Sequence, residues 1–380
     1  MWEKYKGEKL TTPGLILPLI LSFLLGLVFT PLTIAIAVRW NIADKPNGRN
    51  NREIAHIGGV AIIGGILFAL IPAFLFFLPL SPLNGVFVPI LIASGFITFL
   101  LGIIDDLRSL HYLYKLFFQI AVSLLVSASG IGLLEHFGIT SMPLHFAVIA
   151  FLLSSVWMLI VTTSFNLIDG VDGLASGIAV ISAGGFFVAG FIYNIPLVMV
   201  LSAVVFGVML AFLRFNFPPA RIFMGDSGSL FLGLIFGLIT LLMIVSGENI
   251  FYRIAGSLII LSIPLMDCAL AFLRRVMTGR PPFEADHMHL HHILLYRLGS
   301  VRKVDFLLWS LTAFFCILGV FTMRFHIPVL IAASVIELLV FGTALRDMTN
   351  SDFSMEKMDE LICGYGSMRT TATRRQDRAI

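Results

Sequence analysis

Long apolar runs, separated by short polar segments, repeat along almost the whole chain. Each run approaches the roughly 20 residues that a helix needs to cross a membrane. The pattern predicts an all-α, polytopic integral membrane protein with about eleven transmembrane helices. The expected spans are 14–38, 58–80, 86–104, 112–134, 144–162, 174–193, 195–213, 228–246, 251–273, 304–322 and 326–345.

Composition supports the membrane interpretation. Of 380 residues, 58% are hydrophobic and only 12% are charged, whereas a soluble domain has about 25% charged residues. The net charge of +3 does not suggest a nucleic-acid partner, and the three cysteines have no zinc or disulfide spacing. We expect one membrane domain over residues 1–347. The remainder, 348–380, should be a partly disordered cytoplasmic tail, because its end has too few apolar residues to form a core.

The basic residues are distributed unevenly between the two sets of loops. Most of the 25 lysines and arginines fall in one alternating set and in the tail. The positive-inside rule makes that set cytoplasmic, with the N-terminus outside and the C-terminus inside. Lys4, Lys6 and Lys9 resemble the start of a signal peptide and favour the opposite orientation. Because the following run is long and shows no small-residue cleavage site, we expect an uncleaved first helix. The loops of the basic set are 39–57, 105–115, 163–173, 214–227 and 274–303.

One of these loops contains the segment Asn166-Leu167-Ile168-Asp169-Gly170-Val171-Asp172-Gly173. An acid at membrane depth costs about 2.5–3.5 kcal/mol, so such residues usually have a function. Asn and Asp oxygens suit Mg²⁺, which binds one or two carboxylates together with substrate phosphates. The alternative is that Asp169 and Asp172 cap the helix that begins near Leu174. Capping explains one acid but not three polar groups without a balancing Lys or Arg.

Further acids lie at segment ends on the same predicted face. The adjacent carboxylates Asp105 and Asp106 repel each other by about 4 kcal/mol at 4 Å and an effective dielectric of 20. Arg108, Lys115 or a bound cation must offset this repulsion. Asp226, within Gly225-Asp226-Ser227-Gly228, is either the N-cap of the next helix or part of the same polar site.

An exposed aromatic residue near Asp226 suits a nucleobase, which would stack on Phe223; packing is the alternative role. In the first loop of this face, Lys45, Arg49 and Arg52 form either a basic membrane-proximal turn or a phosphate-binding entrance. Gly58-Gly59 would let a ligand approach the backbone at a helix start.

The 274–303 loop contains the densest polar segment of the chain. Four histidines lie between His287 and His292, and Arg280 precedes them. Three interpretations stay open: a pyrophosphate site, a metal site, or a solvated loop. Zinc is disfavoured because no Cys or His-Glu-x-x-His pattern completes a ligand set.

Together these motifs resemble the polyprenyl-phosphate N-acetylhexosamine-1-phosphate transferases, over most of the chain from Asp44 to about Leu295. The His-rich loop is most similar to the N-acetylglucosamine-1-phosphate branch, which has a Pro-Phe pair, an Asp and His-x-His-His. This chain departs from the family at Ser109, His287 and Ala55-His56. The matching stretches are Asp44-Lys45-Pro46-Asn47, Gly58-Gly59, Asp105-Asp106, Lys115, Gln119, Asn166–Leu174, Phe223–Gly228, Arg274-Arg275, Pro282-Phe283, Asp286 and His289–His292.

The resemblance implies an enzyme that transfers N-acetylhexosamine-1-phosphate, in this branch GlcNAc-1-phosphate, from a UDP-sugar to undecaprenyl phosphate and releases UMP. It implies a multi-pass protein of the bacterial plasma membrane, an active site on the cytoplasmic face, and a role in cell-envelope polysaccharides such as O-antigen or teichoic acid. Mg²⁺, or Mn²⁺ in its place, would be the cofactor, and a homodimer is compatible with the family. The implied roles are Asp105, Asp106 and Asp169 in catalysis; Asp226 and Asn166 at the metal; Asp172, Phe223, Arg280, His289, His291 and His292 at the UDP-sugar; and Lys45 and Lys115 at the lipid phosphate.

Two other functions compete with this one. The peptidoglycan branch, which transfers phospho-MurNAc-pentapeptide, shares the acidic motifs but carries a different His-rich loop. An ion-coupled secondary transporter also places acids in membrane helices, but near the bilayer midplane and often with internal repeats. Here the acids gather at one face and no repeat is evident, which favours an enzyme that works from one side.

Overall fold

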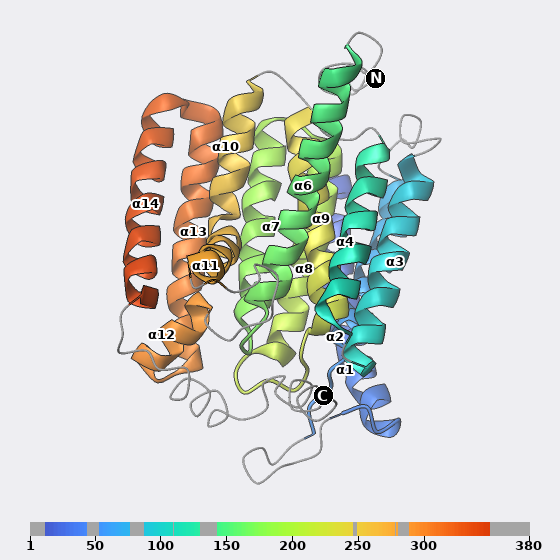
Figure 1. Ribbon diagram of the computed structural model, residues 1–380. Helices are drawn as coiled ribbons and strands as arrows, with labels where there is room; N and C mark the ends of the chain where they lie inside the picture. The colour runs from blue at the N-terminus through green and yellow to red at the C-terminus, as the bar shows by residue number, and fades with distance from the viewer. Residues whose placement is uncertain are drawn as a thin grey trace.

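The computed structural model describes residues 12–43, 53–76, 87–108, 110–129, 143–245, 249–277, 279 and 289–349. Within these ranges the regular structure is a bundle of helices that run up and down beside one another (Figure 1). The one exception in the described part is an isolated parallel bridge between Ala55 and Ile222. The expected all-α membrane fold is therefore confirmed.

The helices follow the predicted spans closely. In the described part, nine are long and apolar enough to cross a membrane, and a bent pair, α10 and α11, supplies a tenth span. The shorter apolar helix α4 lies where the remaining span was expected. The bounds are α1 (Thr12–Arg39), α2 (Gly58–Phe76), α3 (Phe87–Arg108), α4 (Tyr112–Ala128), α6 (Leu144–Ile168), α7 (Leu174–Ile192), α8 (Pro196–Asn216), α9 (Gly225–Val245), α10 (Ile250–Ile260), α11 (Ser262–Met277), α12 (Leu290–Leu298), α13 (Val301–Phe325) and α14 (Ile327–Thr349).

The helices reach further into the polar segments than hydropathy predicts. α3 continues to Arg108, α6 continues to Ile168, and α9 begins at Gly225. Asn166 and Asp226 were expected in loops and instead lie on the terminal turns of α6 and α9. The backbone of a terminal turn holds these side chains more rigidly than a free loop would.

The predicted span 251–273 is not one uncharged helix. Its two halves, α10 and α11, meet at Leu261 with a bend of 77°. It also contains Asp267, which is fully buried. This correction matters because the bend brings α11 toward the end of the bundle where the other polar residues lie.

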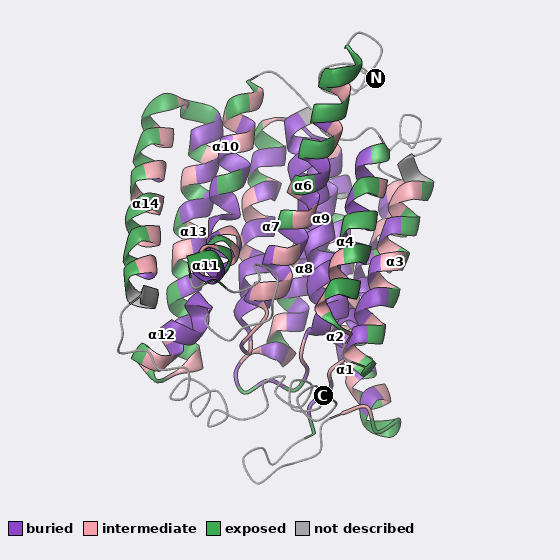
Figure 2. Ribbon diagram, viewed as in Figure 1, coloured by how far each residue is buried: buried purple, intermediate pink, exposed green. Residues whose placement is uncertain are grey.

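Helix α9 forms the centre of the bundle. Every residue from Gly225 to Ile244 is buried, and α2, α3 and α6 pack against this helix (Figure 2). Close approach requires glycine at the first turn of α9, because a Cβ at Gly59 or at Gly102 would overlap with Ser227. By contrast, α14 exposes Ile331 and other large apolar side chains at the edge of the bundle, as a lipid-facing helix does.

Helix ends that carry acids of the predicted site lie at one end of the bundle, the lower end in Figure 1. The last turn of α3 and the first turn of α9 meet there, and α12 lies at the same end. Which side of the membrane this end faces stays a prediction from the basic loops. The boundary of the expected tail lies two residues inside α14, and residues 350–380 lie outside the described part of the chain.

Candidate active site

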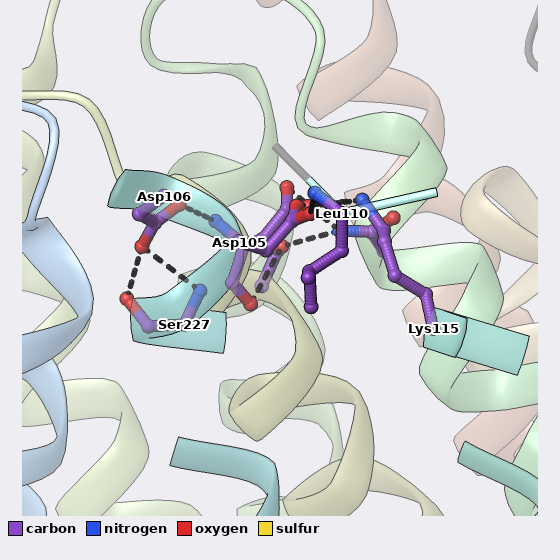
Figure 3. Close-up of polar contacts among 8 residues, drawn as sticks. Asp105, Asp106, Leu110, Lys115 and Ser227 are labelled. Atoms are coloured by element: carbon purple, nitrogen blue, oxygen red, sulfur yellow. Dashed lines mark hydrogen bonds and ion pairs between the residues drawn. The ribbon is translucent and has the colours of Figure 1, made fainter. Parts of the chain in front are cut away.

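A lysine bridges two acids where α3, α4 and α9 meet (Figure 3). The Lys115 ammonium donates to Asp105 Oδ2 at 2.7 Å and forms a second ion pair with Asp226 Oδ2. Asp105 Oδ1 also accepts the backbone N–H of Leu110 at 2.6 Å. Both carboxyl side chains are buried, with 8% and 6% of their surface exposed, whereas Lys115 keeps 23% exposed. The ion pairs offset the cost of burying the two acids.

Asn166 completes this group from the last turn of α6. Its amide Nδ2 donates to Asp226 Oδ1 at 3.1 Å and to Ser229 Oγ at 3.0 Å. Both oxygens of Asp226 are therefore bound, one by Lys115 and the other by Asn166. We call Asp105, Lys115, Asn166 and Asp226 the acid cluster.

Asp106, predicted to be catalytic, makes different contacts from Asp105. Its Oδ1 accepts the backbone N–H of Asp226 at 2.6 Å (Figure 3). Its Oδ2 accepts the N–H of Ser227 at 3.2 Å and the Ser227 hydroxyl at 2.6 Å. The first N–H groups of a helix lack partners within the helix and carry its positive dipole end. Asp106 thus caps α9 from a neighbouring helix and fixes the position of Asp226.

The acid cluster offers oxygen ligands of the kind that Mg²⁺ takes. The described residues contain no group of three His, Cys, Asp or Glu side chains that would hold a metal on its own. Mg²⁺, however, usually takes one or two carboxylates and completes its shell with water and substrate phosphates. Asp226 and the amide oxygen of Asn166 fit that arrangement, and Asp105 lies on the other side of Lys115.

The structure excludes the capping alternative for the central motif. The N-cap of α7 is Gly173, in a left-handed conformation and without a side-chain cap. Asp169 is instead the C-cap residue of α6. Asp172 accepts the backbone N–H of Ala220 at 3.0 Å through Oδ2, and burial raises the pKa of this carboxyl despite that hydrogen bond. Both acids therefore remain candidates for ligand binding.

A third acid, Asp305, lies behind this turn. Asp305, on α13, is fully buried, and in the described part of the chain neither of its oxygens has a hydrogen-bond partner. A Cβ at Gly173 would lie 3.3 Å from its Oδ2. The sequence analysis missed Asp305, although it lies inside the predicted apolar span 304–322. An acid within such a run is the signal that would have identified it.

The histidines meet the central motif at Gly170. His291 is buried against this residue so closely that a Cβ on Gly170 would overlap with Nε2 of the ring. The rings of His289 and His291 are stacked with centroids 5.5 Å apart, and His292 lies 4.2 Å from His291. Burial, followed by the neighbouring His292, holds the pKa of His291 well below its usual value, so this imidazole is neutral. We call these three residues the histidine cluster.

The histidine cluster rests on Asp267, a residue that the sequence analysis missed. This fully buried carboxyl, on α11, lies 2.9 Å from His289 Nδ1 through Oδ2. It accepts the backbone N–H of Leu290 at 2.7 Å through Oδ1. Hydropathy averaged over about 20 apolar residues is little changed by a single acid, so Asp267 was overlooked. A search for charged residues inside the predicted spans would have found it.

Phe223 lies at the edge of the site, half-buried, where it was expected to stack on a base. Its ring packs edge-on against His56 with centroids 5.0 Å apart. The Phe223 backbone bonds to both Ala55 and Gly58, at 2.8 and 3.1 Å, which joins the first loop to the segment before α9. The first loop therefore helps to place Phe223. The predicted site residues Lys45 and Arg280 lie outside the described residues, as do Arg49, Arg52, Ser109, Pro282-Phe283, Asp286 and His287.

The structure brings together most of the predicted site that it describes. The segment from Asn166 to Gly173 contacts the acid cluster at its start, His291 at Gly170, and the Ala220 backbone at Asp172. Fold and site thus define a polytopic membrane protein with an acid- and histidine-lined site at one end of its helix bundle.

Comparison with known proteins identifies the family. Residues 88–244 match the model of glycosyl transferase family 4, a stretch that holds all of the acid cluster. The chain is 30% identical over 304 residues to a probable undecaprenyl-phosphate N-acetylglucosaminyl 1-phosphate transferase of Bacillus subtilis. The aligned residues cover 79% of this chain and 82% of the relative. The chain belongs to glycosyl transferase family 4, and the expected membrane transferase is confirmed at that level.

Other relatives belong to two branches. An undecaprenyl-phosphate alpha-N-acetylglucosaminyl 1-phosphate transferase of Yersinia pestis is 28% identical, over 86% of this chain and 90% of the relative. A phospho-N-acetylmuramoyl-pentapeptide-transferase of Clostridium beijerinckii is 27% identical, over 80% and 94%. The resemblance to this class of phosphosugar transferases, inferred from the motifs, is therefore confirmed.

Proposed function

We propose that this protein transfers N-acetylglucosamine-1-phosphate from UDP-N-acetylglucosamine to undecaprenyl phosphate and releases UMP. The reaction would take place at the cytoplasmic face of a bacterial plasma membrane and start a lipid-linked glycan of the cell envelope. The names of the relatives from Bacillus subtilis and Yersinia pestis support the choice of sugar and lipid. So does the His-x-His-His pattern from His289 to His292.

The observation that carries this proposal is the acid cluster. Asp105 and Asp226 face one ammonium, that of Lys115, at the end of a bundle whose outer helices expose large apolar side chains. A lipid phosphate and a water-soluble nucleotide can meet only at such a membrane edge. Since both substrates are anions, the site must present cations to them, and Lys115 is the partly exposed cation of the cluster.

In the proposed reaction, an oxygen of the lipid phosphate attacks the β-phosphorus of the UDP-sugar. A new P–O bond forms, and the bond from this phosphorus to the bridging oxygen breaks. The electron pair stays on that oxygen, which leaves as part of UMP. No general base is required, because a phosphate monoester with a second pKa of about 6 is already largely ionised at pH 7.

The residues of the acid cluster would hold and neutralise the reacting groups. We assign Asp226 and the Asn166 amide oxygen to a bound Mg²⁺, which supplies charge neutralisation at the diphosphate when present. Lys115 would hold the lipid phosphate, and Asp105 would orient Lys115. Asp106 positions the first turn of α9, so we assign it a supporting role rather than the catalytic role that its motif implies.

The remaining residues would bind the UDP-sugar. Phe223 would stack on the uracil, and Asp172 would accept hydrogen bonds from the nucleoside. The histidine cluster, beside Gly170, would contact the sugar and the diphosphate. Asp169 lies between these groups and the acid cluster along the chain, and we propose that it helps to align the reacting phosphates.

The decisive experiment measures UMP release by the purified protein in detergent. The assay combines undecaprenyl phosphate, Mg²⁺ and a panel of UDP-sugars, with lipid and metal each omitted in turn. UMP that forms only with UDP-N-acetylglucosamine, lipid and Mg²⁺ together supports the proposal. Release that requires UDP-MurNAc-pentapeptide would move the protein to the peptidoglycan branch. No release from folded protein with any sugar would contradict the assignment and favour an ion-coupled transporter.

A further inference from the structure

Asp267 is buried without exposed surface inside an apolar helix, yet the proposed reaction gives it no role. An acid in such a position costs about 2.5–3.5 kcal/mol. A buried carboxylate persists only when hydrogen bonds or charges satisfy it. The groups that satisfy Asp267 therefore indicate what it does.

Its two oxygens bind two adjacent residues at the start of α12. Oδ1 accepts the Leu290 backbone N–H at 2.7 Å, and Oδ2 lies 2.9 Å from the His289 ring nitrogen Nδ1. His289 is the N-cap residue of α12, and its own side chain makes no capping hydrogen bond. Asp267 thus caps α12 from another helix and holds the His289 ring with the same carboxylate.

This contact determines the tautomer of His289. A carboxylate accepts hydrogen bonds, so Nδ1 must carry the proton that it shares with Asp267. Nε2, the other ring nitrogen, is not held by this carboxylate.

The neighbouring His291 is held differently. Its ring is fully buried, and neither nitrogen has a hydrogen-bond partner in the described part of the chain. Burial keeps His291 neutral, as its lowered pKa indicates. Because His289 has a carboxylate partner and His291 has none, the two stacked rings are suited to different tasks.

We propose that Asp267 is a positioning residue that fixes the His289 ring with Nδ1–H toward α11, so that Nε2 is the ring nitrogen left to contact the UDP-sugar. This inference rests on the proposed function. Asp267 itself does not touch the substrate; it acts through His289.

The test compares Asp267→Asn, His289→Gln and the double variant with the wild type. Asn keeps the size of Asp267 and one acceptor oxygen but replaces the other oxygen by an amide donor, so it cannot accept from both His289 and Leu290. We expect kcat/KM for the UDP-sugar to fall about 10- to 100-fold in Asp267→Asn, as for other residues that orient a functional histidine. The loss should appear as a raised KM for the UDP-sugar, in this variant and in His289→Gln alike.

The double variant should be no worse than His289→Gln, because residues that act through one another are not additive. Glu337→Gln is the matched control, since it changes an acid to its amide in α14, a helix that carries no residue of either cluster, and it should leave KM unchanged. A merely structural role would lower the amount of folded enzyme, leave KM unchanged and add to the effect of His289→Gln. Either result, or a wild-type KM in Asp267→Asn, would overturn the proposal.

A second readout does not depend on turnover. Ring ¹⁵N chemical shifts of the full-length protein in nanodiscs, assigned by means of His289→Gln, should show His289 protonated at Nδ1 in the wild type and altered in Asp267→Asn. If the wild type releases no UMP but shows this shift, the proposed function fails while the positioning survives. If His289 is protonated only at Nε2 in the wild type, the inference about Asp267 fails whatever the activity.

Discussion

The acid cluster and the histidine cluster lie at the same end of the bundle but are built in opposite ways. In the acid cluster every carboxylate oxygen has a donor, supplied by Lys115, Asn166 or the Leu110 backbone. In the histidine cluster, His291 has two nitrogens without a partner among the described residues. The first cluster is therefore balanced by its own side chains, whereas the second contains a buried ring whose nitrogens no described residue pairs.

This difference suggests that the acid cluster and the histidine cluster have different roles. A group that is fully paired before its ligand arrives must exchange one partner for another, as Lys115 would when a metal or phosphate enters. The His291 ring has no hydrogen bond of this kind to exchange. We therefore expect substitutions in the acid cluster to change both stability and chemistry, and those in the histidine cluster mainly to change binding and pH dependence.

The largest effect should come from Asp226→Asn. The substitution keeps the shape of the side chain but removes a charge that Lys115 and the proposed metal share, so turnover should fall by at least about 10²- to 10³-fold. The measurement is UMP release at saturating Mg²⁺, together with gel filtration to show that the protein is folded. Full activity would remove Asp226 from the metal site.

Lys115→Met should break the balance of the acid cluster. Asp105 and Asp226 would face each other without a cation, which should cost about 3 kcal/mol, at the low end for a buried ion pair because Lys115 is partly exposed. Added Mg²⁺ should raise the melting temperature of this variant by more than it raises that of the wild type. The exposed Lys303→Met serves as the control. An unchanged melting temperature would show that the lysine does not balance the two acids.

Asp106→Ala separates a positioning role from a catalytic one. The variant loses three hydrogen bonds to the first turn of α9, so its stability should fall by about 2 kcal/mol. Thermal unfolding and UMP release should decline together, and Asp106→Asn, which keeps one acceptor oxygen, should be intermediate. An Asp106→Ala protein with wild-type stability and no activity would instead support the catalytic role that the motif implies.

The smallest effect concerns the pH dependence of stability at His291. Its pKa is lowered in the folded protein, so the unfolded chain takes up a proton below pH 6.5 that the folded protein does not. Stability should therefore fall as the pH is lowered through 6.5, by up to about 1.4 kcal/mol per pH unit.

The comparison is made by denaturant unfolding between pH 7.5 and 5.5. His291→Gln should flatten the slope, whereas the exposed His145→Gln should not. The raised pKa of Asp172 has the opposite effect, because the stability that this carboxyl contributes is lost as the pH rises. Asp172 is present in the wild type and in both histidine variants, so its effect cancels when their slopes are compared. An unaltered slope in His291→Gln would contradict a neutral, buried His291.

The sequence predicted the spans well because the length of an apolar run reflects the thickness of the membrane. It misplaced helix ends, as at Ile168 and Gly225, because hydropathy does not detect backbone hydrogen bonds that continue into polar residues. The bend at Leu261 also escaped it, since the run on either side stays apolar.

The site residues, like the helices, were predicted only in part. Motifs identified Asp105, Asn166 and Asp226, and the structure brings these residues together in one network. No motif distinguishes the cap Asp106 from its neighbour Asp105, because the difference is which helix each carboxylate faces. Asp267 was hidden within an apolar span, and its partner His289 lies 22 residues away in sequence. Such pairings depend on tertiary contacts, which a single sequence does not reveal.

The most direct test of the central claim follows the β-phosphate of the nucleotide sugar. Purified protein is incubated with undecaprenyl phosphate, Mg²⁺ and UDP-N-acetylglucosamine that carries ³²P in its β-phosphate, and the lipid is then extracted. Transfer of a phosphosugar predicts that the label enters the lipid fraction in the same amount as the UMP released. Label that stays in the water phase as UDP, while the sugar alone appears in the lipid, would contradict the account.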